Sequence, residues 1–250
     1  MRLHHKGLYQ EGKGQQGMDD CMLDRQQLHE NGYALLRQVI PRATVDELRT
    51  LFDANVLASE HWPAPRGQDW RHAQLDLEPT VQAMCRLPLL LATVGELIGE
   101  RFFLAQAEGR EPLPGGGHQS LHRDLSAQRP GDSVSALAFL DDYAPGNGAT
   151  RIIPGSHRPA AGAPPDEFNE ESRCVHLQGS AGDILVFDVD LVHAGSLNIS
   201  GARRRSILVS YRAEPLYAMH LETTRLRNVR MDTAERFTPA TYPVHVAALS

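Results

Sequence analysis

The sequence predicts a mainly β domain with α-helices near its N-terminus, and three observations support this fold class. From His122 onward, short apolar stretches alternate with turn-forming residues, which is typical of an all-β domain. Before that point, apolar residues recur at helical spacing between charged ones. A chain of 250 residues also fits one large β domain. We therefore expect a single domain over residues 23–250, preceded by an extension, residues 1–22, whose composition predicts disorder.

Local signals predict the elements of the N-terminal half. Asp24, with Gln27 three residues later, predicts a helix start, and Asn31-Gly32 predicts its end. Two prolines and three consecutive glycines predict an irregular segment at 108–119. The other expected elements are a strand at 33–39, an amphipathic helix at 45–56, a loop at 62–74, helices at 78–86 and 89–98, and a strand at 101–107.

The C-terminal half is expected to supply most of the β-structure. An acidic, proline-bearing excursion is expected at 160–173, and the tail beyond Tyr217 has no clear pattern. The expected strands lie at 134–140, 175–177, 183–188 and 206–212, with a turn at 145–148.

Composition excludes several functional classes. A net charge of −6 argues against general affinity for nucleic acid. No apolar run approaches the roughly 20 residues that a membrane-spanning helix needs. Cys21, Cys85 and Cys174 are scattered and form no Cys-x-x-Cys pair, so we expect reduced thiols and a cytoplasmic location. A small-molecule substrate is the expected partner, and the sequence indicates no particular oligomeric state.

One tripeptide, His122-Arg123-Asp124, predicts a metal site. Side chains at positions i and i+2 of an extended backbone point the same way, so His122 and Asp124 can reach one ion. His193 is the expected third ligand. Two histidines and one carboxylate on one face of an ion are typical of non-heme Fe(II) oxygenases. The alternative is a surface turn, because about one His-x-Asp is expected by chance in a chain of this composition.

Three further features accompany the tripeptide, and together they are specific. These are the run GATRIIPGSHR at 148–158, the run GDILVF at 182–187, and His193 followed by Asn198, Ser200 and Arg204. This pattern resembles the phytanoyl-CoA dioxygenase family of Fe(II)- and 2-oxoglutarate-dependent oxygenases, particularly its short bacterial members. The resemblance spans about residues 23–212. It implies a double-stranded β-helix, a cupin-like jelly-roll barrel, with iron held by His122, Asp124 and His193.

The same resemblance implies that Arg204 anchors 2-oxoglutarate. Period-2 alternation puts Arg204 on the same face as Ser206, while Arg203 and Arg205 point the other way. A planar guanidinium grips a carboxylate through two parallel hydrogen bonds. Arg205 is the substitute if the register differs. Ser206, Thr150 and Gln106 are further candidates for cosubstrate contacts.

Other residues near the motif are given different roles. His118 is interpreted as solvated or substrate-side and His157 as structural, so neither is expected to be a ligand. Mammalian members of the family place a tryptophan beside the cosubstrate, and an alignment through Arg129-Pro130 puts Ala138 there. This smaller side chain is expected either to enlarge the pocket or to change how the 2-oxo acid packs. At the predicted mouth, Arg110, Arg123 and Arg129 suggest tolerance for an anionic or polar substrate, although the alternative is that they are simply solvated.

The implied cofactors are Fe(II), 2-oxoglutarate as cosubstrate, and O2. The implied reaction is hydroxylation of an unactivated C–H bond of a small molecule, with release of succinate and CO2. Asp124 argues against halogenation, because related halogenases lack this carboxylate. Desaturation, epimerisation or ring closure by the same iron chemistry stay open, as does a non-catalytic cupin-like barrel that binds a metal or a small acid. A zinc hydrolase is a third alternative, but it leaves Arg204 unexplained.

Overall fold

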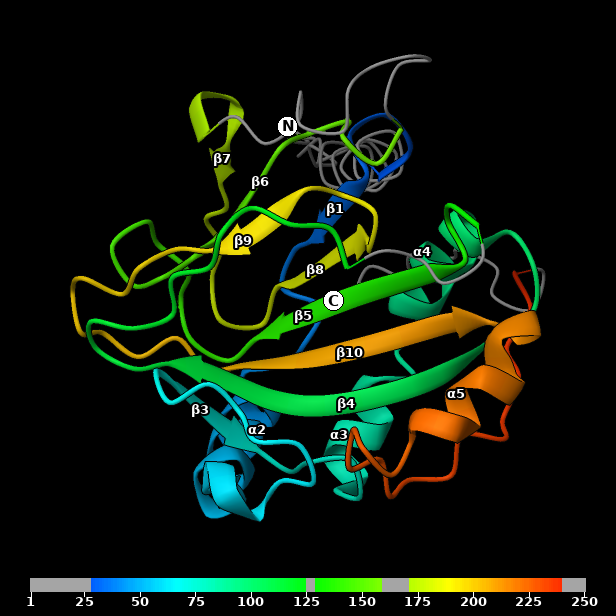
Figure 1. Cartoon of the computed structure of the whole chain (residues 1–250), viewed down its shortest axis with the longest axis horizontal. Coiled ribbons are helices and arrows are strands. Elements are labelled where there is room, and N and C mark those ends of the chain that lie inside the picture. Colours follow the sequence, from blue (N-terminus) through cyan, green and yellow to red (C-terminus); the bar gives the residue numbers. More distant parts are fainter. Residues whose placement is uncertain (1–27, 125–128, 159–170, 240–250) are drawn as a thin grey trace, which may run out of the picture.

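Two antiparallel β-sheets form the centre of the molecule. The computed structural model describes residues 28–124, 129–158 and 171–239, and Figure 1 shows the arrangement. Seven strands make the larger sheet, in the order β1-β8-β5-β10-β4-β3-β2, and three make the smaller, in the order β7-β6-β9. This confirms the predicted mainly β fold of the jelly-roll type. The extension predicted at 1–22 lies outside the described residues.

The strands and helices have the following bounds. The strands are β1 Tyr33–Leu36, β2 Val56–Leu57, β3 Trp70–Ala73, β4 Phe102–Pro112, β5 Ser133–Phe139, β6 Thr150–Ile152, β7 Val175–His176, β8 Ile184–Asp188, β9 His193–Gly195 and β10 Ser206–Ala213. The helices are α2 Arg42–Ala54, α3 Pro79–Met84, α4 Pro88–Ile98 and α5 Tyr217–Thr223, with 3-10 turns η1 Ser59–His61, η3 Glu171–Arg173 and η4 Glu214–Leu216. No helix among the described residues is long and apolar enough to cross a membrane.

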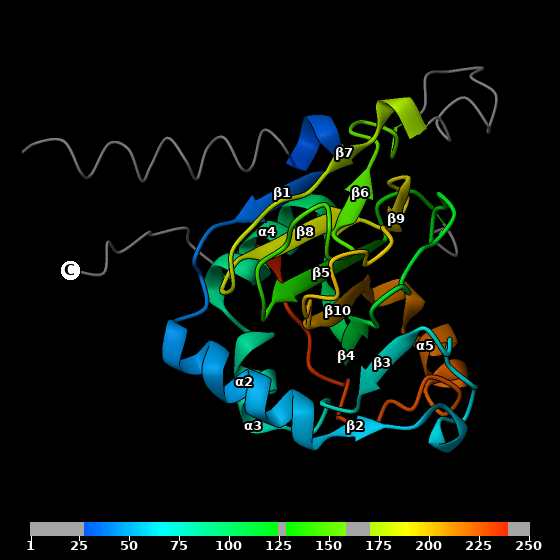
Figure 2. The same cartoon turned by 90° about the vertical axis from the view of Figure 1, so that its left-hand side faces the viewer.

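Helices cover one face of the large sheet and the small sheet covers the other, as Figure 2 shows. Val45, Leu48 and Phe52 of α2 are fully buried in a core with the helix-facing residues of the sheet. On the opposite face, Phe139 packs in a second apolar cluster with Ile152 of the small sheet. Alternation along each strand therefore sends one set of side chains to the helices and the other into the space between the sheets.

The predictions at 62–74 and 108–119 are partly wrong. Residues 70–73 form β3, and β4 continues to Pro112, where it pairs with Trp70. Gly109 marks close packing, because a Cβ built on it would lie 2.6 Å from the Phe52 ring. Irregular backbone begins only after Pro112, with positive φ angles at Gly115 and Gly117.

The tail beyond Tyr217 is ordered structure over the described residues up to 239. Helix α5 packs across β4 through aromatic contacts, with ring centroids of Phe103 and Tyr217 5.1 Å apart. Phe237 then pairs with Phe102 at the start of β4. This segment closes one end of the large sheet, on the right in Figure 1. Residues 28–31 are helical, whereas the predicted start at Asp24 and most of the 160–173 excursion lie outside the described residues.

Candidate metal centre

Sheet pairing brings the three predicted ligands together. His193 opens β9, and its backbone N–H donates to the His122 carbonyl at 2.9 Å, while the His122 N–H donates to the His193 carbonyl at 3.1 Å. The Asp124 N–H donates to the Val189 carbonyl at 3.0 Å, which continues the extended pairing. His122, Asp124 and His193 each offer a ligand atom, and these atoms lie within 4.8 Å of one another.

Backbone carbonyls orient both imidazoles. The Nδ1 atoms of His122 and His193 lie 2.8 Å from the carbonyl oxygens of Ser120 and Leu191. A carbonyl only accepts, so each neutral ring donates its Nδ1 proton and keeps the Nε2 lone pair free. The Asp124 carboxylate lies 3.6 Å from the His122 Nε2 and 3.7 Å from the His193 Nε2. All three donors therefore face one point, as metal ligands must.

The donor set fits Fe(II). Burial lowers the pKa of His193 despite the nearby Asp124 charge, which favours the neutral imidazole that binds metal. His193 is buried, whereas Asp124 is exposed, so one side of the cluster stays open to small molecules. No other cluster of this kind occurs among the described residues. His118 and His157 lie outside this cluster.

A pocket between the two sheets joins the cluster to Arg204. Its volume is about 580 Å³ including the open mouth. Residues of both sheets and of the preceding loop line it: Trp70, Arg110, Gln119, His122, Asp124, Leu137, Thr150, Phe187, His193, Gly195, Arg204, Ser206 and Leu208.

Arg204 is a buried cation without a hydrogen-bonding partner in the described chain. It is 2% exposed, and its Nε is buried and unpaired. Its guanidinium carbon lies 4.7 Å from the Tyr143 ring centroid and 5.5 Å from that of Trp70. A buried guanidinium flanked by aromatic faces and lacking a carboxylate is suited to an oxyanion ligand.

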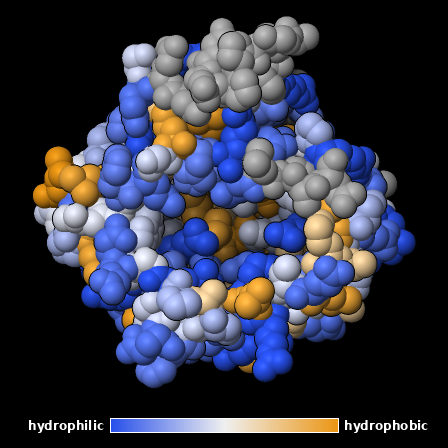
Figure 3. All heavy atoms as spheres, in the orientation of Figure 1, coloured by the Kyte–Doolittle hydropathy of each residue, from blue (hydrophilic) through white to orange (hydrophobic). Residues whose placement is uncertain are grey.

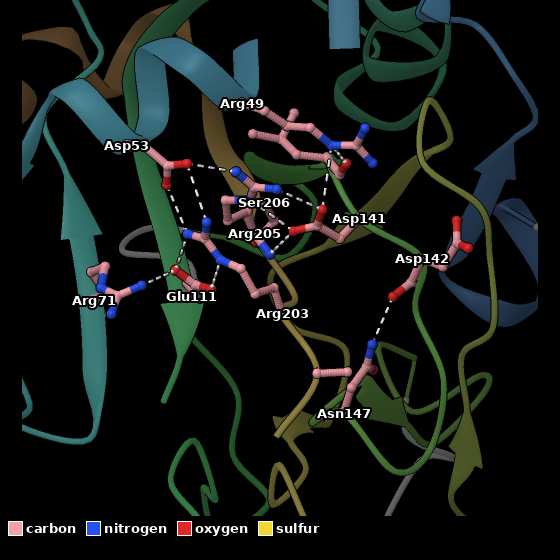
Figure 4. A network of polar contacts seen from close by, with 12 residues as sticks. Arg49, Asp53, Arg71, Glu111, Asp141, Asp142, Asn147, Arg203, Arg205 and Ser206 are labelled. Carbon is pink, nitrogen blue, oxygen red and sulfur yellow. Dashed lines mark hydrogen bonds and ion pairs between the residues drawn. The ribbon is translucent and has the colours of Figure 1, made fainter. Parts of the chain in front are cut away.

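The neighbouring arginines point away from the pocket, as alternation predicts. Arg205 donates from Nε and Nη2 to the two Asp141 oxygens at 2.9 Å, and Arg203 binds Glu111. Asp53 joins both arginines in one network, shown in Figure 4. This network occupies Arg205, so of the three consecutive arginines only Arg204 lines the pocket.

The remaining predicted contacts divide into two groups. Thr150 and Ser206 line the pocket, although the Ser206 hydroxyl donates to the Arg110 carbonyl at 3.2 Å. Gln106 lies outside it, where its amide donates to Glu108 at 2.8 Å. The structure therefore brings Thr150 and Ser206 to the site and not Gln106.

The expectation for Ala138 is wrong. Ala138 is fully buried in the core on the helix side of β5, while its neighbour Leu137 faces the pocket. Sequence reasoning also missed Trp70 and Gln119. Gln119 accepts the Gly195 N–H at 2.9 Å and so ties the loop before the tripeptide to β9. The alternation of β3 carried the signal for Trp70, but that segment was interpreted as a loop.

Comparison with known sequences gives one family. The sequence profile of the phytanoyl-CoA dioxygenase (PhyH) family matches residues 28–206. The Fe(II)/2-oxoglutarate-dependent dioxygenase nvfF of Aspergillus novofumigatus is 28% identical over 211 residues, covering 72% of this chain and 67% of that protein. The uncharacterized protein Rv1501 of Mycobacterium tuberculosis is 36% identical over 90 residues, 36% of this chain and 32% of that protein. Relatives are thus fungal and bacterial, and the expected bacterial origin stays a prediction.

Solved structures of other proteins share this fold. The epimerase SnoN, in complex with Fe3+, alpha ketoglutarate and nogalamycin RO, aligns with a TM-score of 0.64 at 18% identity, covering 78% of this chain and 84% of SnoN. HygX from Streptomyces hygroscopicus, with nickel, 2-oxoglutarate and hygromycin B bound, aligns with a TM-score of 0.61 at 16% identity. The alignment covers 76% of this chain and 87% of HygX. At this identity the similarity is one of fold.

Proposed function

The chain belongs to the phytanoyl-CoA dioxygenase family of Fe(II)- and 2-oxoglutarate-dependent oxygenases, and from this premise we propose that it hydroxylates an unactivated C–H bond of a small organic substrate. Succinate and CO2 are the expected coproducts. One observation carries the proposal. The same pocket presents the cluster of His122, Asp124 and His193 on one wall and the unpaired guanidinium of Arg204 on another.

His122, Asp124 and His193 would hold Fe(II) from one side. When bound with 2-oxoglutarate and O2, the iron supplies the oxidant for an unactivated C–H bond. The two Nδ1–H hydrogen bonds keep both imidazoles turned toward the metal point, and this preorganisation spares the site reorganisation on binding.

Arg204 would grip the distal carboxylate of 2-oxoglutarate through two parallel N–H···O bonds. Tyr143 and Trp70 flank the guanidinium and keep water from it, which strengthens that ion pair. Ser206 and Thr150 offer hydroxyls on the same pocket wall. With 2-oxoglutarate anchored at both ends, the open side near the exposed Asp124 is left for the substrate.

The Asp124 carboxylate supports hydroxylation over halogenation, since Asp124 would be one of the metal ligands and related halogenases lack this carboxylate. Epimerisation, desaturation and ring closure depend on substrate pose and are distinguished by product analysis. SnoN is an epimerase and SnoK, of similar fold, is a carbocyclase. The SnoN and HygX structures each hold an organic small molecule, and we propose a substrate of that general kind here.

An anaerobic titration with Fe(II) and 2-oxoglutarate tests the proposal. We expect a weak visible charge-transfer band that requires both additions, and succinate once air is admitted with pools of candidate substrates. Mass spectrometry of the consumed substrate then shows a gain of one oxygen atom for hydroxylation. A protein that binds Fe(II) or a small acid, yet gives neither band nor succinate, is the non-catalytic barrel instead.

A further inference from the structure

A second, larger cavity adjoins the metal pocket. It measures about 1280 Å³ including its open mouth and shares Arg110, Asp124 and Leu208 with the first pocket. Its other walls come from β4, β5, β10, Val189 and the segment around α5. Figure 3 shows a hollow over β5 and β10 with an apolar floor and a hydrophilic rim. A substrate seated here would reach the metal cluster at the Asp124 end.

Arg212 of β10 lines this cavity as an uncompensated cation. Its backbone pairs with β4 and β5, whereas its side chain makes no hydrogen bond or ion pair with the described residues. Burial lowers its pKa, and attraction to Asp132 offsets only part of that effect. Asp132 is 1% exposed and already accepts hydrogen bonds from the Arg129 N–H and the Ser133 hydroxyl. The Arg212 guanidinium thus stays available to a ligand.

Arg227 lines the same cavity and has neutral partners. It donates to Gln106 Oε1 at 3.1 Å, to Thr223 Oγ1 at 3.2 Å and to His220 Nδ1 at 2.8 Å. Burial, together with the positive charge of Arg212, lowers the pKa of Arg227 to about 10. Arg227 therefore keeps its charge at neutral pH without a carboxylate that neutralises it.

Glu108, the carboxylate that attracts Arg227, already forms ion pairs with other arginines. Glu108 attracts Arg227, but its oxygens form ion pairs with Arg66 at 2.8 Å and Arg110 at 2.7 Å. His220 lies beside these arginines and accepts a hydrogen bond from Arg227. Burial and the neighbouring arginines, Arg227 foremost, lower its pKa to about 4. This end of the cavity is therefore electropositive.

We propose that Arg212 binds an oxyanion, a carboxylate or a phosphate ester, carried by the primary substrate, and that the positive charge of Arg227, whose own N–H groups already donate to neutral acceptors, attracts the same group. The apolar part of that substrate lies along Leu208 and Met219, two apolar residues of the same cavity, of which Leu208 also lines the metal pocket. This inference rests on the proposed function, since it places the substrate of that same reaction. It also replaces two of the arginines first considered: Arg123 and Arg129 do not line the cavity, and Arg129 pairs with Glu100.

The chemistry of the cavity supports an amphipathic anion. A partly buried guanidinium without a counter-charge gains from an oxyanion that replaces lost hydration, and the planar Arg212 guanidinium suits the geometry of a carboxylate or phosphate. Ser135 and Ser210, paired across β5 and β10, add hydroxyls to the same cavity.

Binding of three matched probes tests the inference. Octanoate, octyl phosphate and 1-octanol are titrated calorimetrically into anaerobic protein saturated with Fe(II) and 2-oxoglutarate, so that Arg204 is already occupied. We expect at least one anion to bind about tenfold or more tightly than the alcohol, since charge-assisted hydrogen bonds are the strong ones. Preference between the two anions identifies the carboxylate or the phosphate as the recognised group.

Substitutions of Arg212 and Arg227 test whether anion binding depends on these two residues. Arg212→Gln should weaken the preferred anion about tenfold or more and leave 1-octanol unchanged, and Arg212→Lys should restore part of the loss. Arg227→Lys, which keeps the charge and spares the segment around α5, should weaken the anion less than Arg212→Gln does. Arg225→Gln is the matched control. This substitution also removes one positive charge, but Arg225 is exposed and lies outside the cavity.

Three outcomes would overturn the inference: no binding of either anion, equal affinity for the alcohol, or an unchanged anion affinity in Arg212→Gln. The charge-transfer band and succinate formation are measured on the same samples. Loss of these signals with intact Arg212-dependent anion binding rejects the hydroxylase and keeps the anion site. Normal signals with no anion binding reject the anion site alone.

Discussion

His122 and His193 exchange a pair of backbone hydrogen bonds across an antiparallel bridge, at 3.1 and 2.9 Å. Their ring centroids consequently lie 4.6 Å apart. Residues far apart in the chain thus meet through sheet register, and the metal site forms as the sheet forms. Removing one imidazole leaves this backbone bridge in place, so we expect a ligand to be removable without loss of the fold.

His193→Ala should therefore abolish Fe(II) retention without unfolding the protein. Two of three ligands remain, and a bidentate remnant with one exposed carboxylate binds iron weakly. Iron content by atomic emission after anaerobic gel filtration, together with circular dichroism, measures both parts. His118→Ala is the control, because this exposed histidine lies outside the cluster and should retain iron as the wild type does. Full iron retention in His193→Ala would remove it from the ligand set.

Arg204→Lys should raise the Kd for 2-oxoglutarate by about 10- to 100-fold, which corresponds to roughly 1.5–3 kcal/mol for a lost charge-assisted hydrogen bond. The lysine keeps the charge but loses the two parallel donors. Iron binding without 2-oxoglutarate should not change, because Arg204 is not among the ligands. Titration of the visible band against 2-oxoglutarate gives the Kd. Arg205→Lys, whose side chain points to the outer network, should bind 2-oxoglutarate normally.

The metal cluster was predictable because its geometry is local or periodic. The i, i+2 spacing of His122 and Asp124 places both on one side of an extended strand, and alternation separates Arg204 from its two neighbours. The partner strand of the tripeptide was harder to predict, since a strand sequence does not state its register. Only the wider pattern of motifs pointed to His193.

The failures have different physical causes. The segment 108–119 was predicted to be irregular because of its prolines and glycines, yet its first part is strand, in which Gly109 makes room for the Phe52 ring of a distant helix. Ala138 was placed by alignment, and a difference of one residue moves a side chain to the other face of a sheet. Arg212 and Arg227 were missed because they meet only when the patternless tail packs against β10. Contacts between distant segments leave no local signal in the sequence.

Asp141→Ala should lower the free energy of unfolding by about 1–3 kcal/mol, because it leaves the buried Arg205 guanidinium with an incomplete set of acceptors. Burial alone raises the pKa of Asp141, but the hydrogen bonds and the charge of Arg205 lower it overall. The native state therefore favours the ionised carboxylate of Asp141. Asp46→Ala removes an exposed partner of Arg49 and should cost at most about 1 kcal/mol. Urea unfolding measures both. Equal effects would show that the Asp141 pair behaves as a surface ion pair.

Asp188 should make the protein less stable as the pH rises from about 4 to about 6. Burial raises the pKa of its carboxyl from 3.8 to about 6, so the native state binds more protons than the unfolded state in this window and unfolding becomes easier with rising pH. Asp188→Asn keeps an acceptor for the Asp190 N–H, removes the titration, and should add roughly 1–3 kcal/mol at pH 7. Asp232→Asn is the matched control, because this exposed carboxylate accepts the Ala234 N–H with the same spacing. Thermal unfolding from pH 4 to 7 should show a flatter profile for Asp188→Asn alone, and a profile as steep as the wild type would mean that Asp188 ionises freely in the native fold.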